Sequence, residues 1–222
     1  MVQRARELVE EARRGIAPVE ERIRQHPYLQ AIEGGRVDRG ALAIFAGQQQ
    51  HIIESDLRSV ALILARSASQ ATRDFFLGML QGERAALEAL AAFGKAVGIS
   101  GGDQAAEPLP GAFAYSAYVA WLALYGSPAE FAGAFLVNLE AWGANCARMS
   151  RALRDGYGLT AQDVAFFDLF AVAPPGFEER GLGVVDEGLA GGVEPARIRR
   201  AARLLQGFEL LYWDTMLQAT QA

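Results

Sequence analysis

The sequence predicts an all-α protein, a bundle of about seven or eight helices. Apolar residues recur at spacings of three and four along nearly every segment, which is the period of an amphipathic helix. No stretch shows the strict alternation of polar and apolar residues that is typical of a half-buried strand. No repeat, low-complexity tract or long linker divides the chain, so we expect residues 1–222 to form one domain.

The periodicity and the end signals together define the expected helices. They span residues 3–25, 38–67, 69–98, 110–125, 128–155, 160–171, 177–190 and 194–220. Pro27 terminates or kinks the first helix, because proline disfavours helical geometry in the residue before it. Residues 98–111 collect glycine and proline and cannot continue a helix.

Three later helices have readable starts. Ser127 is an expected N-cap, with Pro128 in the first turn and Glu130 at the third position, which is the pattern of a capping box. Thr160 is expected to cap the next helix in the same way, with Asp163 three residues further on. The stretch GGVEPARI marks the start of the last helix.

Composition and charge exclude several classes of partner. Of the 222 residues, 51% are hydrophobic and 21% are charged, which is enough for a large core. The net charge is -5 and no dense basic run is present, so we expect no nucleic-acid partner. No signal peptide and no membrane span are apparent either, so we expect a cytoplasmic protein without membrane contact.

The supply of metal-binding and nucleophilic side chains is small. Cys146 is the only cysteine, which excludes an intrachain disulfide and a cysteine-based zinc motif. No base or positive charge accompanies it in its own segment, so we expect a small buried hydrophobe. His26 and His51 are the only histidines, and no glycine-rich phosphate loop is present. We therefore expect no metal and no cofactor.

A run of polar residues interrupts the expected helix 38–67, within the stretch AIFAGQQQHIIESDL. Helical spacing places Gln49, Ile52 and Asp56 on one face, and Gln48 and His51 on the neighbouring face. A buried amide left without a partner costs on the order of 1 to 3 kcal/mol. Either Gln49, with Gln48 or His51, binds a polar ligand, or these side chains pair with other helices or with solvent.

Two further helices carry candidate site residues. Glu209, Tyr212 and Trp213 cluster at helical spacing in the last helix, and an acid among aromatic residues would have its pKa raised by desolvation. Such a group suits proton transfer, although a core stripe with Glu209 at its solvent edge has the same spacing. Asn138 and Trp142 share one side of the expected helix 128–155.

Three blocks carry a family resemblance. They are HPYLQAIEGGRVDRGALAIFAGQQQHIIESDLRSVALILARS, YSAYVAWLALYGSPAEFAGAFLVNLEAW and FELLYWDTM. In this order they resemble the TenA (thiaminase II) and PqqC superfamily of the haem-oxygenase-like fold, over about residues 17–218. The resemblance implies a haem-oxygenase-like bundle around a ligand cavity. It also implies a small-molecule ligand and a homo-oligomer, a dimer or a tetramer.

The TenA branch hydrolyses thiamin or aminopyrimidine breakdown products. Its Tyr-x-x-Gln-Asp-x-x-Tyr pattern reads Phe45, Gln48, Gln49 and Ile52 here, and its catalytic cysteine position falls near Asn138. The C-terminal glutamate motif is retained, so the resemblance implies that Glu209 is catalytic. The ligand-binding residues that it implies, together with the PqqC branch, are His26, Gln48, Gln49, Ile52, Asn138, Trp142, Phe170 and Tyr212.

The segment YGLTAQDVAFFDLFAVAPPGFEE resembles PqqC and the related di-iron oxidases. Their ligand positions read Phe170, Pro174, Phe177, Glu83, Leu90 and Glu140 in this chain. Two glutamates without a histidine cannot hold a di-iron centre, so we expect no metal. His26 matches a histidine that faces the ligand in the PqqC branch.

Three functions stay open at this point. The first is a metal-free TenA-like protein that binds, and as an enzyme hydrolyses, a small nitrogen heterocycle held by Glu209. The second is a cofactor-free, oxygen-dependent oxidase of the PqqC type, for which Phe170 would make the cavity more apolar. The third is a non-catalytic binding or regulatory protein.

Overall fold

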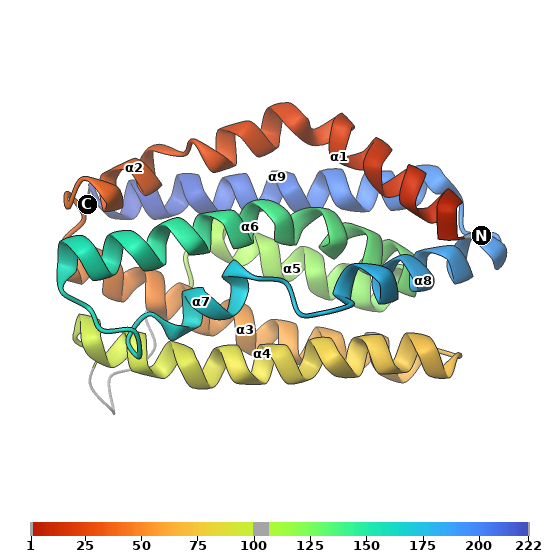
Figure 1. Cartoon of the computed structure of the whole chain (residues 1–222), viewed down its shortest axis with the longest axis horizontal. Coiled ribbons are helices and arrows are strands. Elements are labelled where there is room, and N and C mark those ends of the chain that lie inside the picture. The colour runs from red at the N-terminus through yellow and green to blue at the C-terminus, as the bar shows by residue number, and fades with distance from the viewer. Residues whose placement is uncertain (1, 100–106, 222) are drawn as a thin grey trace.

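The computed structural model describes residues 2–99 and 107–221, and within these ranges the regular structure is helical throughout (Figure 1). The helices are α1 (Val2–Arg24), α2 (Pro27–Glu33), α3 (Arg39–Arg66), α4 (Gln70–Val97), α5 (Pro110–Tyr125), α6 (Pro128–Tyr157), α7 (Ala165–Ala171), α8 (Phe177–Ala190) and α9 (Pro195–Ala219). The predicted all-α class is confirmed. Residues 100–106 of the predicted break lie outside the described residues.

One helix was not predicted. After α1, the chain turns at His26 and Pro27 into α2, a helix of 7 residues. The His26 ring accepts a hydrogen bond from the backbone N–H of Tyr28 and so acts as the N-cap. Pro27 occupies the first position of this helix. A backbone N–H at that position has no partner within the helix, so a proline, which has no N–H, costs no hydrogen bond there. Two turns are too short for an apolar period to show in the sequence.

The predicted caps differ in outcome. Ser127 and Glu130 form the full capping box at the start of α6, as predicted. Thr160 and Asp163 also exchange bonds, Thr160 N–H to Asp163 Oδ2 at 2.8 Å and Asp163 N–H to Thr160 Oγ1 at 3.3 Å. These bonds close a turn instead of a helix, and α7 begins only at Ala165. The predicted helix start at residue 160 was therefore wrong.

Long helices run side by side along the long axis of the molecule (Figure 1). α3 pairs with α4 and α5, and α6 packs against α9, α7 and α8. Two hydrophobic clusters fill the interior, one centred on α8 and the first half of α6, the other on α2, α7 and the last part of α9. None of the helices in the described ranges is long and apolar enough to span a bilayer.

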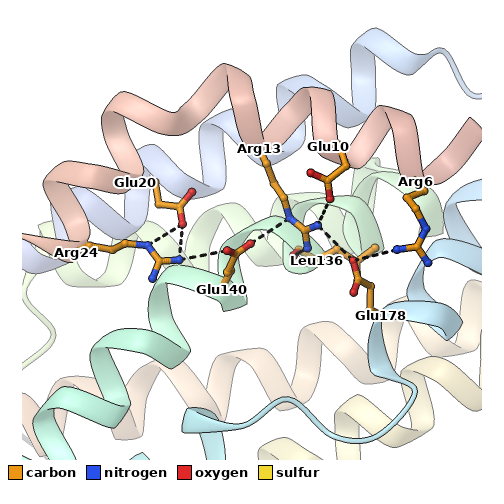
Figure 2. Close-up of polar contacts among 8 residues, drawn as sticks. All are labelled: Arg6, Glu10, Arg13, Glu20, Arg24, Leu136, Glu140 and Glu178. Carbon is orange, nitrogen blue, oxygen red and sulfur yellow. Dashed lines mark hydrogen bonds and ion pairs between the residues drawn. The ribbon is translucent and has the colours of Figure 1, made fainter.

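Ion pairs fasten α1 to the outside of α6 and α8 (Figure 2). Arg13 contacts Glu140 at 3.2 Å and Glu178 at 3.2 Å, and its guanidinium also donates to the Leu136 carbonyl oxygen at 3.3 Å. Arg24 reaches the other oxygen of Glu140 at 3.4 Å. The Glu140 side chain is 50% exposed, so it belongs to this surface network and not to the interior.

Candidate functional site

A cavity lies between α3, α4, α5, α6, α7 and α9, where the two hydrophobic clusters meet. About 50 Å³ of its interior is open to the centre of a water molecule, and about 480 Å³ lies between atoms when the open space at its mouth is included. The lining consists of Gln49, Ile52, Ile53, Asp56, Glu83, Tyr115, Phe135, Asn138, Leu139, Trp142, Phe170, Glu209 and Tyr212.

A hydrogen-bonded chain fixes the carboxyl group of Glu209 in the cavity wall. Asn138 Nδ2 donates to Glu209 Oε2 at 2.6 Å, and Trp213 Nε1 donates to Oε1 at 3.1 Å. Tyr115 in turn donates its hydroxyl to Asn138 Oδ1 at 2.8 Å. Three helices, α5, α6 and α9, therefore hold one carboxyl group in a single orientation.

The environment of Glu209 brings the pKa of its carboxyl group close to neutral pH. Burial raises the pKa of Glu209 to about 8, while the bonds from Trp213 and Asn138 oppose the shift. The side chain is almost fully buried, so water cannot stabilise its charged form. A carboxyl group with such a pKa can both give and take a proton at physiological pH.

A second pair of acids lies on the α3 and α4 side of the cavity. Asp56 follows Gln49 by two helical turns on the same face, and Glu83 lies on the neighbouring α4. Burial raises the pKa of both carboxyl groups, and repulsion from Glu83 raises that of Asp56 further. Asp56 Oδ1 has no hydrogen-bond partner among the described residues.

Aromatic rings form the wall between α6, α7 and α9. The Trp142 ring lies edge-on to Phe170 and to Tyr212, with centroids 5.9 and 6.2 Å apart. Gly143 allows α7 to approach, because a Cβ atom there would lie 2.6 Å from the carbonyl oxygen of Phe170. The position of Phe170 in the wall therefore depends on a glycine in α6.

Most of the predicted site residues share this cavity. Its lining includes Glu209, Gln49, Ile52, Asn138, Trp142, Phe170 and Tyr212. His26 and Gln48 lie outside it. The His26 Nε2 atom is 3.1 Å from Asp214 Oδ1, and Gln48 bonds to Glu107 O at 3.0 Å and Leu109 N at 2.8 Å, which holds the chain before α5.

The sequence reasoning did not assign three polar residues of the site. Asp56 was on the predicted face of Gln49, so its helical spacing was the available signal. The sequence predicts no role for Glu83, which only matches one metal-ligand position of the related di-iron oxidases. Tyr115 gave no signal, because its helix is apolar on all sides and no inward face can be distinguished.

The donors of a di-iron centre are not gathered in one place. Glu83 lines the cavity, but Glu140 lies outside on the α1 network (Figure 2). Phe170 supplies a ring and Leu90 packs in the core. No group of three or more histidine, cysteine or acidic residues that could hold a metal occurs within the described ranges. The residues present do not fit the iron site of the oxidase relatives.

Fold and cavity together define a helical-bundle protein of the haem-oxygenase-like class, as predicted. The family model described as TENA/THI-4/PQQC family matches residues 14–168. The chain belongs to this family. A search of curated proteins gave no significant match.

Solved structures with the same fold cover nearly the whole chain. A TenA homologue from Pseudomonas syringae pv. tomato str. DC3000 has a TM-score of 0.80 at 12% identity, covering 94% of this chain and 92% of its own. A domain of unknown function with a haem oxygenase-like fold from Shewanella denitrificans OS217 has a TM-score of 0.75 at 16% identity, covering 94% and 91%. A suggested TenA-like thiaminase from Sulfolobus solfataricus P2 has a TM-score of 0.69 at 14% identity, covering 95% of each chain.

Proposed function

We propose that this protein binds a small nitrogen heterocycle of the thiamin-pyrimidine type in the cavity and hydrolyses it. The observation that carries the proposal is the buried Glu209 carboxyl group, held by Asn138 and Trp213 in the wall of a cavity lined by aromatic and polar side chains. Family membership supports the same class of ligand. The similarity to a suggested TenA-like thiaminase adds support for the reaction.

The polar groups of the cavity suit an uncharged heterocycle edge. When protonated, Glu209 donates its O–H to a ring nitrogen, and the Gln49 amide can both donate and accept a hydrogen bond. Trp142 and Tyr212 provide aromatic surface beside these groups, against which a planar ring packs favourably. A ring with nitrogen acceptors and amino donors at its edge would satisfy both kinds of polar group.

A cysteine nucleophile is not available for this reaction. Asn138 stands near the position at which the family carries its catalytic cysteine, and it is committed to Glu209 and Tyr115. Cys146 is fully buried in the core and is not part of the cavity lining. Burial raises the pKa of its thiol well above the ordinary value, so its reactive thiolate is not populated. Water is therefore the nucleophile that we propose.

Glu209 then serves in both halves of a hydrolysis. Its proton passes to the ring nitrogen, which makes the neighbouring carbon more electrophilic. The water oxygen then bonds to this carbon as the carbon–nitrogen bond breaks, and the amine or thiazole leaves with the bonding electron pair. The ring nitrogen returns its proton to the Glu209 carboxylate, so the enzyme is restored, and the proton that water loses goes to the released amine or to solvent. A group with a pKa of about 8 is protonated at the start of this cycle at neutral pH, as the mechanism requires.

The test is hydrolysis of thiamin and of an aminomethyl-substituted aminopyrimidine by the purified protein, followed by chromatography of the products. Glu209→Gln should lower the rate by about 100-fold or more, because the proton donor is lost while the shape is kept. Glu88→Gln is the control, since this glutamate is exposed on α4 and pairs with Arg84. An inactive wild-type protein that also fails to bind either compound would contradict the proposal.

The apolar part of the cavity favours a second candidate, a cofactor-free oxidase of the PqqC type. Ile52, Phe135 and Phe170 line it together with other apolar side chains, and such a dry wall suits an electron-rich substrate that reacts with oxygen. Oxygen consumption by the purified protein with phenol or quinol substrates distinguishes this candidate from hydrolysis. Uptake without hydrolysis would favour the oxidase.

A homo-oligomer, a dimer or a tetramer, stays a prediction from the family. Light scattering coupled to gel filtration measures it directly. A monomer at micromolar concentration would contradict this part of the proposal.

A further inference from the structure

Asp56 and Glu83 form a carboxyl pair that the proposed hydrolysis does not use. They come from adjacent helices, α3 and α4, and both line the cavity. Burial raises the pKa of both carboxyl groups, and repulsion from Glu83 raises that of Asp56 further. Two carboxyl groups that face one apolar space without a cation are costly to keep there.

Among the residues that the structure describes, this pair has no positive partner. No lysine or arginine belongs to the cavity lining, and neither acid takes part in an ion pair in the described part of the chain. Asp56 is 3% exposed, and its Oδ1 atom has no hydrogen-bond partner among the described residues. An unpaired buried acceptor in a cavity wall leaves a hydrogen bond for a ligand to make.

Two tyrosines line the cavity together with these acids. Tyr212 is 2% exposed and lines the cavity from α9, and its hydroxyl group lies beside the Gln49 amide, which opposes the rise that burial causes in the pKa of Tyr212. Tyr115 on α5 lies between the two acidic regions, because Asp56, Glu83 and Glu209 all act on its ionisation. Asp56 and Glu83 line the cavity from α3 and α4, which pack closely on each other, whereas Glu209 lines it from α9, which contacts α3 only slightly. The cavity thus has two polar ends.

We propose that Asp56 and Glu83 form a subsite for a protonated amine, which the ligand carries on an arm away from the ring held at Glu209. The identity of the ring rests on the proposed function, but the amine subsite does not. An ammonium group brings three N–H donors and one positive charge, which match two carboxyl groups and the free Oδ1 atom. The ligand is therefore an organic cation at neutral pH.

A metal ion fits the pair less well than an amine. Two carboxyl groups are the only acidic or imidazole donors at this end, and the described residues hold no group of three such donors. Iron, zinc and manganese sites in proteins need more ligands in fixed geometry. The surrounding wall of Ile52, Ile53 and Phe135 suits the carbon chain of an amine instead.

Binding of the amine should change the protonation of the pair. In the free protein, burial and mutual repulsion favour the protonated forms, and Tyr115 and Glu209 face the same cavity as further acids. A positive charge beside the pair favours the ionised forms, so protons leave as the amine binds. Calorimetry in two buffers of different ionisation enthalpy measures this release.

The direct test compares two aminopyrimidines that differ in one arm, an aminomethyl group or a hydroxymethyl group. Only the first carries a charge at neutral pH. All affinities are measured in the Glu209→Gln background, which prevents hydrolysis of the aminomethyl compound to the hydroxymethyl compound. With Asp56 and Glu83 intact, the protein should bind the aminomethyl compound at least about tenfold more tightly, because its hydrogen bonds are charge-assisted. Asp56→Asn and Glu83→Gln should each reduce this ratio to within about twofold, and Glu88→Gln should leave it unchanged.

Each of the remaining outcomes decides for or against the amine subsite. Equal affinity for both compounds when Asp56 and Glu83 are intact overturns the amine subsite and leaves the proposed function standing. If neither aminopyrimidine binds, the proposed function fails, and benzylamine against benzyl alcohol tests the subsite alone. Tight binding of Mn²⁺ alone that both substitutions abolish overturns the amine in favour of a metal. Glu83→Gln is the variant to rely on if Asp56→Asn does not fold, because Glu83 is less deeply buried.

Discussion

The acidic residues inside the bundle contrast with those on its outer face. Asn138 and Glu140 lie two residues apart on α6, yet the first bonds to Glu209 in the cavity and the second meets Arg13 and Arg24 outside (Figure 2). Every acid of the outer network, including Glu178, has an arginine within reach. The acids that line the cavity have amide groups, an indole ring and other acids as their neighbours.

This contrast separates structural acids from candidate ligand-binding acids. Paired and solvated charges, such as Glu140, contribute little to stability but hold α1 in place. A buried carboxyl group without a cation lowers stability when it ionises, so a chain keeps it only where something else uses it. The comparison therefore predicts opposite responses to substitution and to pH in the two regions.

The largest expected effect is the pH dependence of stability. The pKa of Glu209 rises from 4.5 to about 8 on folding, so the unfolded state ionises first. The contribution of Glu209 to the free energy of unfolding is then largest below about pH 4.5 and falls by several kcal/mol as the pH rises to about 8. Urea denaturation across this range measures it. Glu209→Gln should make the slope clearly shallower, and an unchanged slope would show that Glu209 is not the titrating group.

Asn138→Leu should have the next largest effect. It removes a hydrogen-bond partner from Tyr115, from Gln206 and from one carboxyl oxygen of Glu209, and costs about 1 to 3 kcal/mol. The pKa of Glu209 should rise further, because a bond that favours its ionised form is lost. The matched control is Glu140→Leu, because Glu140 lies only two residues further along α6 but on its outer face. This variant should cost less than about 1 kcal/mol. Equal costs would remove the distinction between the two faces of α6.

A third pair of variants tests how α6 positions the aromatic wall. Gly143→Ala places a methyl group against the Phe170 carbonyl oxygen and should cost about 1 to 3 kcal/mol while displacing Phe170. Gly156→Ala in the same helix meets no atom within 4 Å and should be neutral or stabilising by up to about 1 kcal/mol. Thermal unfolding measures the stability of both variants. Near-ultraviolet circular dichroism detects a change in the packing of aromatic side chains such as Trp142. A neutral Gly143→Ala would show that α7 does not need this close approach.

The smallest effect is expected for the outer network. Arg24→Gln removes ion pairs with Glu20 and Glu140, and should lower the free energy of unfolding by less than about 1 kcal/mol. The loss should shrink in high salt, because exposed charges are screened. Urea denaturation at two ionic strengths measures this. A large loss that salt does not change would mean that these pairs behave like buried ones.

The sequence predicted more of the fold than of the site. Periodicity located the long helices because each buries one face along many turns, as in α3, whose face carries Gln49, Ile52 and Asp56 into the cavity. It could not locate α2, which is two turns long, or the true start of α7 after the Thr160 turn. Local capping bonds alone do not distinguish a turn from a helix.

Long-range packing decided the rest of the site. Nothing in the sequence around Glu83 and Glu140 shows that one faces a cavity and the other an arginine, since that depends on how α4 and α6 are rotated. The same applies to Gln48, which neighbours Gln49 but bonds to the chain before α5. Tyr115 lies in a helix with no polar face, so only the folded chain shows its contact with Asn138.

A crystal structure of the Glu209→Gln protein, which cannot hydrolyse the aminomethyl-substituted aminopyrimidine, in complex with this compound tests the central claim most directly, namely that the buried acids of the cavity hold a ligand. We expect the ring within hydrogen-bond distance of the side chain at position 209 and the amine nitrogen within hydrogen-bond distance of Asp56. A ligand bound elsewhere on the protein, with the cavity closed around unchanged side chains, would contradict it.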